Sequence, residues 1–373
     1  MNYAEKEARL WSRLGPRATF GTAMVQRAKV DERLLALSAD TRSSAGLEPF
    51  RREFPDRYID FGIAEQNMIL AAAALASEGF HVVTTTFSPF ETMRCCEQIR
   101  VQLGLMRLPV VMVGLGAGLV LGEQGFTHCC FEDVGVLRSI PNLTILEPAD
   151  CGAVVQSLDT ALALNSPVYL RLTGGPRCAM VYPSPAEITA GRANVLRDGS
   201  EPTQAEGQER LDAAIFSAGA SVAEALRAAD ILAEQGITAA VVDMVSVKPL
   251  DTAVIDQFIS PTDRQERFAP CLPAENGEIS GRLAEKPGWN QSPQRAQILA
   301  VVEEHNIYGG LADAVAGHLA QKGGAPPLQV FGVSDRYVKP GPYRYLLEQY
   351  GLTAENIAKT LKIALDEEKR GTV

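Results

Sequence analysis

The sequence lacks the features that direct a chain to a membrane or to nucleic acid. No uninterrupted apolar run approaches the roughly 20 residues that a membrane-spanning helix requires. The N-terminal stretch MNYAEKEARLW is charged and has no apolar centre, so we expect no signal peptide. Lys and Arg form no cluster and the formal net charge is -10, which disfavours nucleic acids and anionic membranes as partners.

The seven cysteines lack the C-x-x-C spacing of zinc sites and redox motifs. They include two adjacent pairs, Cys95-Cys96 and Cys129-Cys130, which do not form a disulfide framework. His128 directly precedes the second pair, but the order H-C-C does not suit a tetrahedral metal site. We therefore expect reduced thiols, a cytoplasmic location and no metal ligands in this chain.

What the sequence does contain is enough apolar material for two domains. Of the 373 residues, 46% are hydrophobic and 21% are charged. The pattern predicts strands within residues 33–40, 81–87, 108–116, 142–150 and 166–173, and helices over 64–78, 88–105 and 151–164. Strands that are apolar on both faces and alternate with helices are typical of a parallel sheet covered on both sides.

A second alternation of strands and helices begins near residue 212 and continues to residue 322. We therefore predict an α/β protein with a first domain over residues 1–185, a linker over 186–212 and a second domain over 213–373. A stretch rich in Pro, Gly and charge, at about 262–294, is predicted to be an exposed insert in the second domain.

The glycines of GLGAGLVLG, residues 114–122, invite comparison with a dinucleotide-binding loop. Gly114, Gly116 and Gly118 alternate, however, and the third glycine of G-x-G-x-x-G would fall on Leu119. We expect instead a loop whose backbone runs close to another part of the molecule.

Glu65 is a candidate functional residue. It begins the predicted helix 64–78, where a Glu commonly favours the helix dipole. The residues that follow, ILAAAAL, have no polar face, which predicts a helix buried on all sides. A buried carboxylate with no Lys or Arg nearby in the chain needs another partner to offset its desolvation.

Three aromatic side chains have more than one interpretation. Phe87 and Phe90 stand three residues apart at the start of the predicted helix 88–105. That spacing is more typical of core packing than of a platform for a ligand. His128 lies in the polar segment GEQGFTHCCFED, where a structural role and an active-site role are both open.

In this order, these stretches resemble the transketolase family of thiamine diphosphate enzymes. The segments that carry the resemblance are GIAEQNM, TFSPFETMR, GEQGFTHCCFED, LRSIPNLTILEPAD, EEHNIYGGLADAVA and LLEQYGLTAENI. The resemblance covers nearly the whole chain except the linker and the insert. It implies a pyrimidine-binding domain with a parallel sheet, followed by a transketolase C-terminal-type α/β domain.

The resemblance also implies roles at the cofactor. Glu65 would bond the N1′ atom of the aminopyrimidine of thiamine diphosphate and would act in catalysis. Phe87 and Phe90 would form a wall against the pyrimidine ring. Asp40, in the segment LSADTRSS, would lie near the cofactor.

Further positions of the family are associated with the substrate. Arg17, Ser44 and Arg171 match positions that hold the phosphate of the acceptor, for which the bidentate geometry of Arg is well suited. His128 matches an active-site histidine near the substrate. Gln124 stands where the family has an acidic residue associated with a sugar hydroxyl.

The G-D-G motif, which in this family holds the diphosphate and Mg²⁺, does not occur in the sequence. The resemblance therefore implies the C-terminal component of a split transketolase, active only with a separately encoded N-terminal subunit. That subunit would bind Mg²⁺, and the two chains would share thiamine diphosphate. The expected assembly is a two-plus-two heterotetramer.

Departures from the family pattern leave the reaction open. Gln124 replaces an acidic residue, Gly116 a histidine and Met93 an aromatic residue. The leading hypothesis is transfer of a two-carbon ketol unit between sugar phosphates in a specialised pathway. The second is decarboxylating transfer from pyruvate, as in deoxyxylulose-phosphate synthase, which FPDRYIDFGIAEQN resembles equally. The third is a catalytically silent regulatory partner, against which the retention of Glu65 argues.

Overall fold

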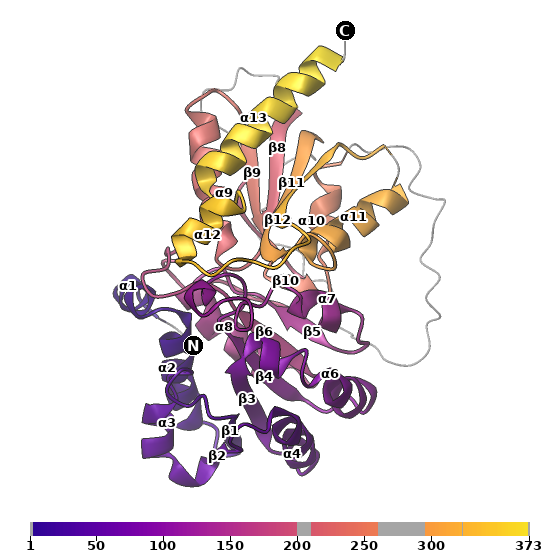
Figure 1. The fold of residues 1–373 in the computed structure, drawn as a ribbon. Helices are drawn as coiled ribbons and strands as arrows, with labels where there is room; N and C mark the ends of the chain where they lie inside the picture. The colour runs from indigo at the N-terminus through magenta and orange to yellow at the C-terminus, as the bar shows by residue number, and fades with distance from the viewer. Residues whose placement is uncertain (1–2, 200–209, 260–294, 323, 372–373) are drawn as a thin grey trace.

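The computed structural model describes residues 3–199, 210–259, 295–322 and 324–371, which form two α/β domains (Figure 1). The predicted insert at 262–294 lies outside the described residues. Within the described ranges, no helix is both long enough and apolar enough to cross a membrane.

The first domain is built on a seven-stranded sheet with the order β10-β5-β6-β4-β3-β1-β2. Its strands are β1 (Leu34–Ser38), β2 (Tyr58–Asp60), β3 (His81–Phe87), β4 (Val110–Leu115), β5 (Thr144–Leu146), β6 (Val168–Leu172) and β10 (Ser246–Lys248). Strands β1 to β6 run parallel, whereas β10 is antiparallel to β5. Every residue of β1, β4 and β6 is buried, as their apolar runs predicted.

Helices cover both faces of this sheet (Figure 1). One face packs against α1 (Glu5–Leu14), α2 (Pro16–Ala28) and α8 (Cys151–Ala163), and the other against α4 (Glu65–Ser77), the π-helical turn η2 (Ile99–Leu105) and α7 (Asp133–Arg138). Two short helices, α3 (Glu48–Glu53) and η1 (Pro55–Arg57), connect β1 to β2.

The prediction of a single helix over residues 88–105 is wrong. The chain forms α5 (Ser88–Glu91), turns, and then forms α6 (Cys96–Gln98) and η2. At the break the Thr92 hydroxyl donates to the Ser88 carbonyl at 2.7 Å. The Thr92 backbone N–H still donates to the same carbonyl at 3.0 Å, and the chain leaves the helix at Thr92 itself, where φ is −104° and ψ is −72°.

Helix α4 is not buried on all sides, contrary to the prediction from its apolar composition. Gln66, Leu70 and Ala74 are exposed, and their spacing of four residues places them on one face. The error arises because small apolar side chains are common on protein surfaces, so composition alone does not reveal which face is covered.

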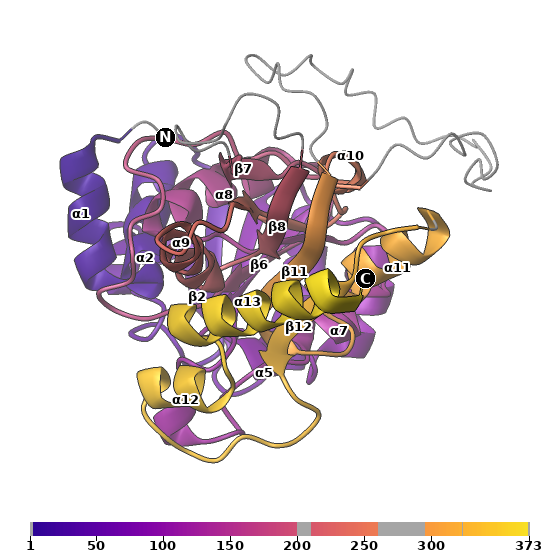
Figure 2. The same ribbon diagram turned by 90° about the horizontal axis from the view of Figure 1, so that it is seen from above.

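The second domain is built on a five-stranded sheet with the order β12-β11-β8-β9-β7. Its strands are β7 (Asn194–Arg197), β8 (Arg210–Ser217), β9 (Ala239–Asp243), β11 (Arg295–Asn306) and β12 (Leu328–Val333). Strand β7 lies in the predicted linker 186–212 and pairs antiparallel with β9. Helices α9 (Ser221–Ala233) and α13 (Ala354–Gly371) pack together over one face, and α10 (Thr252–Asp256) and α11 (Leu311–Lys322) cover the other (Figures 1 and 2).

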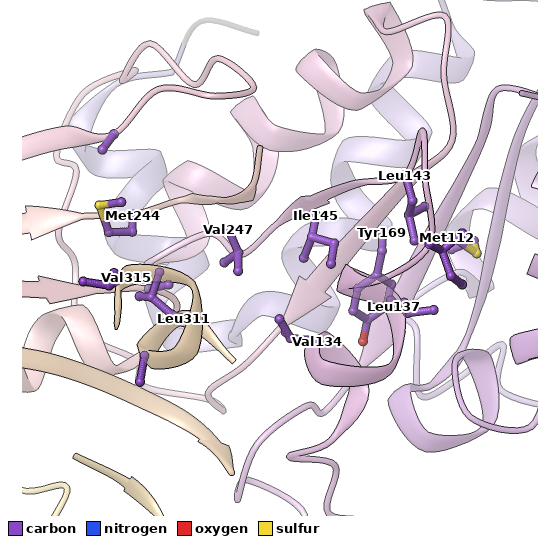
Figure 3. Packing of buried hydrophobic residues seen from close by; sticks show 14 of the residues in the cluster. Met112, Val134, Leu137, Leu143, Ile145, Tyr169, Met244, Val247, Leu311 and Val315 are labelled. Atoms are coloured by element: carbon purple, nitrogen blue, oxygen red, sulfur yellow. The ribbon is translucent and has the colours of Figure 1, made fainter. Parts of the chain in front are cut away.

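The two domains share part of their core. One apolar cluster runs from Met112 and Tyr169 in the first domain to Met244 and Val315 in the second (Figure 3). Strand β10 follows β9 in the chain yet completes the edge of the first sheet. The second domain is therefore packed firmly against the loops at one end of the first sheet.

Candidate active site

Glu65 is the first residue of α4, and its side chain is only 4% exposed. The nearby sequence offers this carboxylate no cation, but the fold does, because Arg94 Nη1 donates to Glu65 Oε1 at 2.5 Å. Arg94 stands 29 residues further along the chain, in the turn after α5, so no local pattern links the two residues. Since the Arg94 side chain is half-exposed, it can move aside and let a ligand approach the carboxylate.

Three rings gather beside this ion pair. The His128 ring lies 5.7 Å from Phe87 and 5.6 Å from Phe90, centroid to centroid, and the two Phe rings are 6.3 Å apart. All three contacts are edge-to-face. The Arg94 guanidinium lies 4.3 Å from the Phe90 centroid. The rings are half-buried, so they are not sealed in the core, and the structure brings them together with Glu65.

Glu91 is a buried carboxyl near this cluster that sequence reasoning missed. Burial raises its pKa to about 8, and the charge of Glu65 adds to the increase. Thr84 donates to Glu91 Oε1, whereas Oε2 has no hydrogen-bond partner in the described part of the chain. No local signal identifies Glu91, because its burial arises only when α5 folds against β3.

Asp40 and Gln124 are both exposed. Asp40 follows β1 with a φ of +55°, and its backbone N–H donates to Asp60 Oδ1 at 3.1 Å. Gln124 ends the 3₁₀ turn η3 (Gly122–Gln124). Neither side chain forms a hydrogen bond or ion pair with Glu65 or His128 within the described residues.

A pocket of about 370 Å³ contains Arg17 and Ser44. It is lined by the start of α2, the loop after β1 and the turn that follows β6. Arg17 is half-buried, and burial lowers the pKa of its guanidinium. No hydrogen bond or ion pair among the described residues occupies that guanidinium. An unpaired guanidinium beside a hydroxyl and a helix N-terminus is suited to an anionic group.

The prediction that Arg171 binds a phosphate is wrong. The side chain is fully buried in β6. Its Nε donates to Asp133 Oδ2 at 2.9 Å and its Nη1 to Glu147 Oε1 at 2.7 Å. Its Nη2 donates to the carbonyls of Cys130 and Glu304. A guanidinium that donates to four protein oxygens and is shielded from solvent cannot reach the phosphate of a substrate.

Buried ionisable groups from both domains surround Arg171. Burial raises the pKa of Glu147 and of Glu303 to about 7. Burial, aided by the nearby Arg171 charge, lowers the pKa of His305 to about 4. Glu303 accepts the backbone N–H groups of Leu311 and Ala312. The two domains are joined here by the bond from Arg171 to the Glu304 carbonyl and by the Gly135 N–H, which donates to His305 Nε2 at 3.2 Å. The sequence patterns did not identify these buried groups.

The prediction of a close backbone approach at the glycine-rich loop is confirmed. Gly116 and Gly118 have φ values of +65° and +72°, which favour glycine. A Cβ on Gly116 would lie 2.6 Å from Leu121 Cδ1, and one on Gly118 would lie 2.5 Å from Glu304 Oε2.

Family models match both domains. The model of the transketolase pyrimidine-binding domain matches residues 14–175, and that of the transketolase C-terminal domain matches residues 204–265 and 284–357. The chain belongs to the transketolase family. This confirms the predicted family and fold class, and members of the family use thiamine diphosphate.

This transketolase-family chain is similar to proteins of its own length and to halves of longer ones. It is 32% identical to a putative transketolase C-terminal section of Methanocaldococcus jannaschii, over 95% of this chain and 97% of the relative. It is 33% identical to the 6-deoxy-6-sulfo-D-fructose transketolase subunit SqwH of Clostridium sp. strain MSTE9, over 92% of each chain. It is 34% identical to the 1-deoxy-D-xylulose-5-phosphate synthase of Desulforudis audaxviator, but it spans 47% of that protein.

A solved structure described as a split gene transketolase, inactive beta4 tetramer, has a similar fold. The TM-score is 0.74 at 28% identity, over 95% of this chain and 98% of that chain. The transketolase-family chain therefore corresponds in extent to the C-terminal section of a split transketolase.

Proposed function

We propose that the chain is the C-terminal subunit of a split thiamine diphosphate-dependent transketolase that transfers a two-carbon ketol unit between sugar phosphates. The observation that carries the proposal is the cluster of Glu65, Phe87, Phe90 and His128. These residues come from three separate segments of the pyrimidine-binding domain, and a buried carboxylate lies next to rings that remain accessible.

The cluster fits the pyrimidine ring of thiamine diphosphate. When bound, this cofactor supplies the electron sink for cleaving and forming carbon–carbon bonds. Glu65 would exchange its contact with the half-exposed Arg94 for a hydrogen bond with the ring. Phe87 and Phe90 would pack against the ring faces, and Asp40, at the end of β1, would lie near the cofactor.

The acceptor would place its anionic end in the pocket of Arg17 and Ser44, where an unpaired guanidinium favours a phosphate or a sulfonate. The sulfonate is considered because one relative is named as a 6-deoxy-6-sulfo-D-fructose transketolase subunit. In this arrangement His128 and Gln124 would contact the substrate closer to the reacting carbon.

The proposed function requires a partner. We infer a separately encoded N-terminal subunit that holds Mg²⁺ and the diphosphate in a two-plus-two heterotetramer. Two observations support this inference: the match in length to a transketolase C-terminal section, and the likeness to a split gene transketolase solved as an inactive beta4 tetramer.

Decarboxylating transfer from pyruvate is the second candidate function, favoured by the 34% identity to a 1-deoxy-D-xylulose-5-phosphate synthase. The test is to reconstitute the chain with its N-terminal subunit and supply either ketose phosphates or pyruvate. Ketol transfer without CO₂ supports the first function, and release of CO₂ from pyruvate supports the second. If neither donor reacts, the chain is a silent partner.

Glu65→Gln tests the cofactor assignment in the same complex. We expect activity to fall roughly 100- to 10,000-fold, the range typical of a lost acid–base group. The matched control is Glu97→Gln, which removes an exposed carboxylate paired with Arg100 in the same domain. Unchanged activity in Glu65→Gln would overturn the assignment.

A further inference from the structure

The loop of residues 118–130, here called the His128 loop, lies between the two domains. It follows β4 and is closed at its base by an antiparallel bridge between Gly118 and Cys130. On one side it presents His128 to Phe87 and Phe90. On the other side it contacts the second domain at three levels, all of which involve residues 336–346, here called the clamp segment, directly or through Glu304.

The first contact lies at the base of the His128 loop. The Leu119 N–H donates to Oε2 of the buried Glu304 at 3.1 Å. Tyr343 of the clamp segment donates from its hydroxyl to the other oxygen of the same carboxylate. Tyr343 therefore orients the carboxylate that holds the first turn of the loop.

The second contact joins the two backbones. The Gly341 N–H of the clamp segment donates to the Gly122 carbonyl at 3.0 Å. A Cβ on Gly122 would lie 2.1 Å from Leu346 Cδ1 and 2.6 Å from the Gly341 carbonyl oxygen. The absence of a side chain at Gly122 is therefore what allows this approach.

The third contact lies at the tip of the loop, two residues before His128. The Phe126 and Tyr337 ring centroids are 4.6 Å apart at an interplanar angle of 45°. Tyr337 is 73% exposed and Phe126 is 48% exposed. Because both rings face solvent to this extent, their tilted contact adds little to the core, but it joins the tip of the loop to the second domain.

We propose that Tyr337 is a positioning residue for the active site. By packing against Phe126 it keeps the His128 loop closed against the second domain, so that His128 remains against Phe87 and Phe90 while substrate is bound. The second domain thereby acts on the reaction without contacting the cofactor. The catalytic part of this inference rests on the proposed function, whereas the closure of the loop does not.

Hydrogen exchange of the full chain measures loop closure directly. His128 and Cys129 both donate their backbone N–H to the Gly125 carbonyl at 3.1 Å, so their exchange reports on loop opening. An aromatic pair shifts such an equilibrium by a factor of roughly 2 to 12. Tyr337→Ala should therefore accelerate exchange of these two amides by that factor, and Tyr337→Phe should retain the wild-type rates.

Tyr308→Ala is the matched control. Tyr308 is a 61% exposed tyrosine of the second domain, and no ring contact involves it within the described residues. Its removal should leave exchange in the His128 loop unchanged. The proposal is overturned if Tyr337→Ala leaves that exchange unchanged, or if exchange accelerates equally in β8, since the whole domain would then be loosened.

Kinetics of the reconstituted complex test the catalytic part. Tyr337→Ala should lower kcat/KM for the acceptor at least 2-fold, with Tyr337→Phe restoring it and the Kd of thiamine diphosphate unchanged. Faster exchange with unchanged kcat/KM overturns the positioning role. If the wild-type complex transfers nothing from any donor, the proposed function fails, and exchange still decides whether Tyr337 closes the loop.

Discussion

Replacing Arg171 by Met removes the cation from a buried ionic junction. Arg171 contacts Asp133 at 2.9 Å and Glu147 at 2.7 Å, and all three side chains are shielded from solvent. Met is unbranched and apolar, so it fills much of the same space without satisfying either carboxylate. Removing one partner of a buried ion pair costs about 3–5 kcal/mol, because the remaining charge is left without compensation.

The loss of stability should depend on pH. Burial raises the pKa of Glu147 to about 7 even with Arg171 in contact. At pH 8, one unit above this pKa, the folded wild-type protein is about 1.4 kcal/mol more stable with the carboxyl ionised than with it protonated. Without Arg171 the carboxyl no longer ionises at pH 8, and this contribution is lost. At pH 6 the carboxyl is protonated in both proteins, so this additional loss of about 1.4 kcal/mol disappears and the rest of the destabilisation remains. His305 adds to this pH dependence. Burial lowers the pKa of its imidazole, and the nearby Arg171 charge lowers it further. Without Arg171 the imidazole accepts a proton more readily, which reduces the loss of stability at pH 6.

Urea unfolding at pH 8 and pH 6, followed by far-UV circular dichroism, measures both effects. The free energy of unfolding of Arg171→Met should fall by about 3–5 kcal/mol at pH 8 and by about 1.4 kcal/mol less at pH 6. The matched control is Arg100→Met, whose side chain pairs with Glu97 while 59% exposed, and it should leave the stability essentially unchanged at either pH. A loss below about 1 kcal/mol at pH 8, or a greater loss at pH 6, would refute the reasoning.

Two further predictions concern pH and substrate. Burial raises the pKa of both Glu91 and Asp243 to about 8, above the values near 4 of unfolded chains, so the folded state binds more protons. Wild-type stability should therefore rise by roughly 1 kcal/mol per carboxyl as pH falls from 8.5 to 7, and urea midpoints that fall instead would contradict this. Arg17→Ala should raise the KM for a phosphorylated acceptor roughly 10- to 100-fold, because a charge-assisted hydrogen bond is lost. The exposed Arg13 provides the control, and equal effects of Arg13→Ala and Arg17→Ala in steady-state assays would argue against the anion pocket.

Local patterns predicted much of the fold. The apolar runs around Ala36, Val113 and Leu170 became buried parallel strands, since a strand that is apolar on both faces requires cover on both sides. The helix beginning at Glu65 was also placed correctly. The break after Glu91 was not foreseen, because no Gly or Pro stands at residues 92–95 to mark the end of a helix.

The sequence by itself determined the fold class and the family and suggested a set of candidate site residues, because periodicity and short motifs are local properties of the chain. The tertiary structure alone decided the partners of those residues. It paired Glu65 with Arg94, buried Arg171 between carboxylates of the domain junction, and set Tyr337 against the loop of His128. Each of these contacts joins residues far apart in sequence, and their side-chain directions follow from how the two sheets pack.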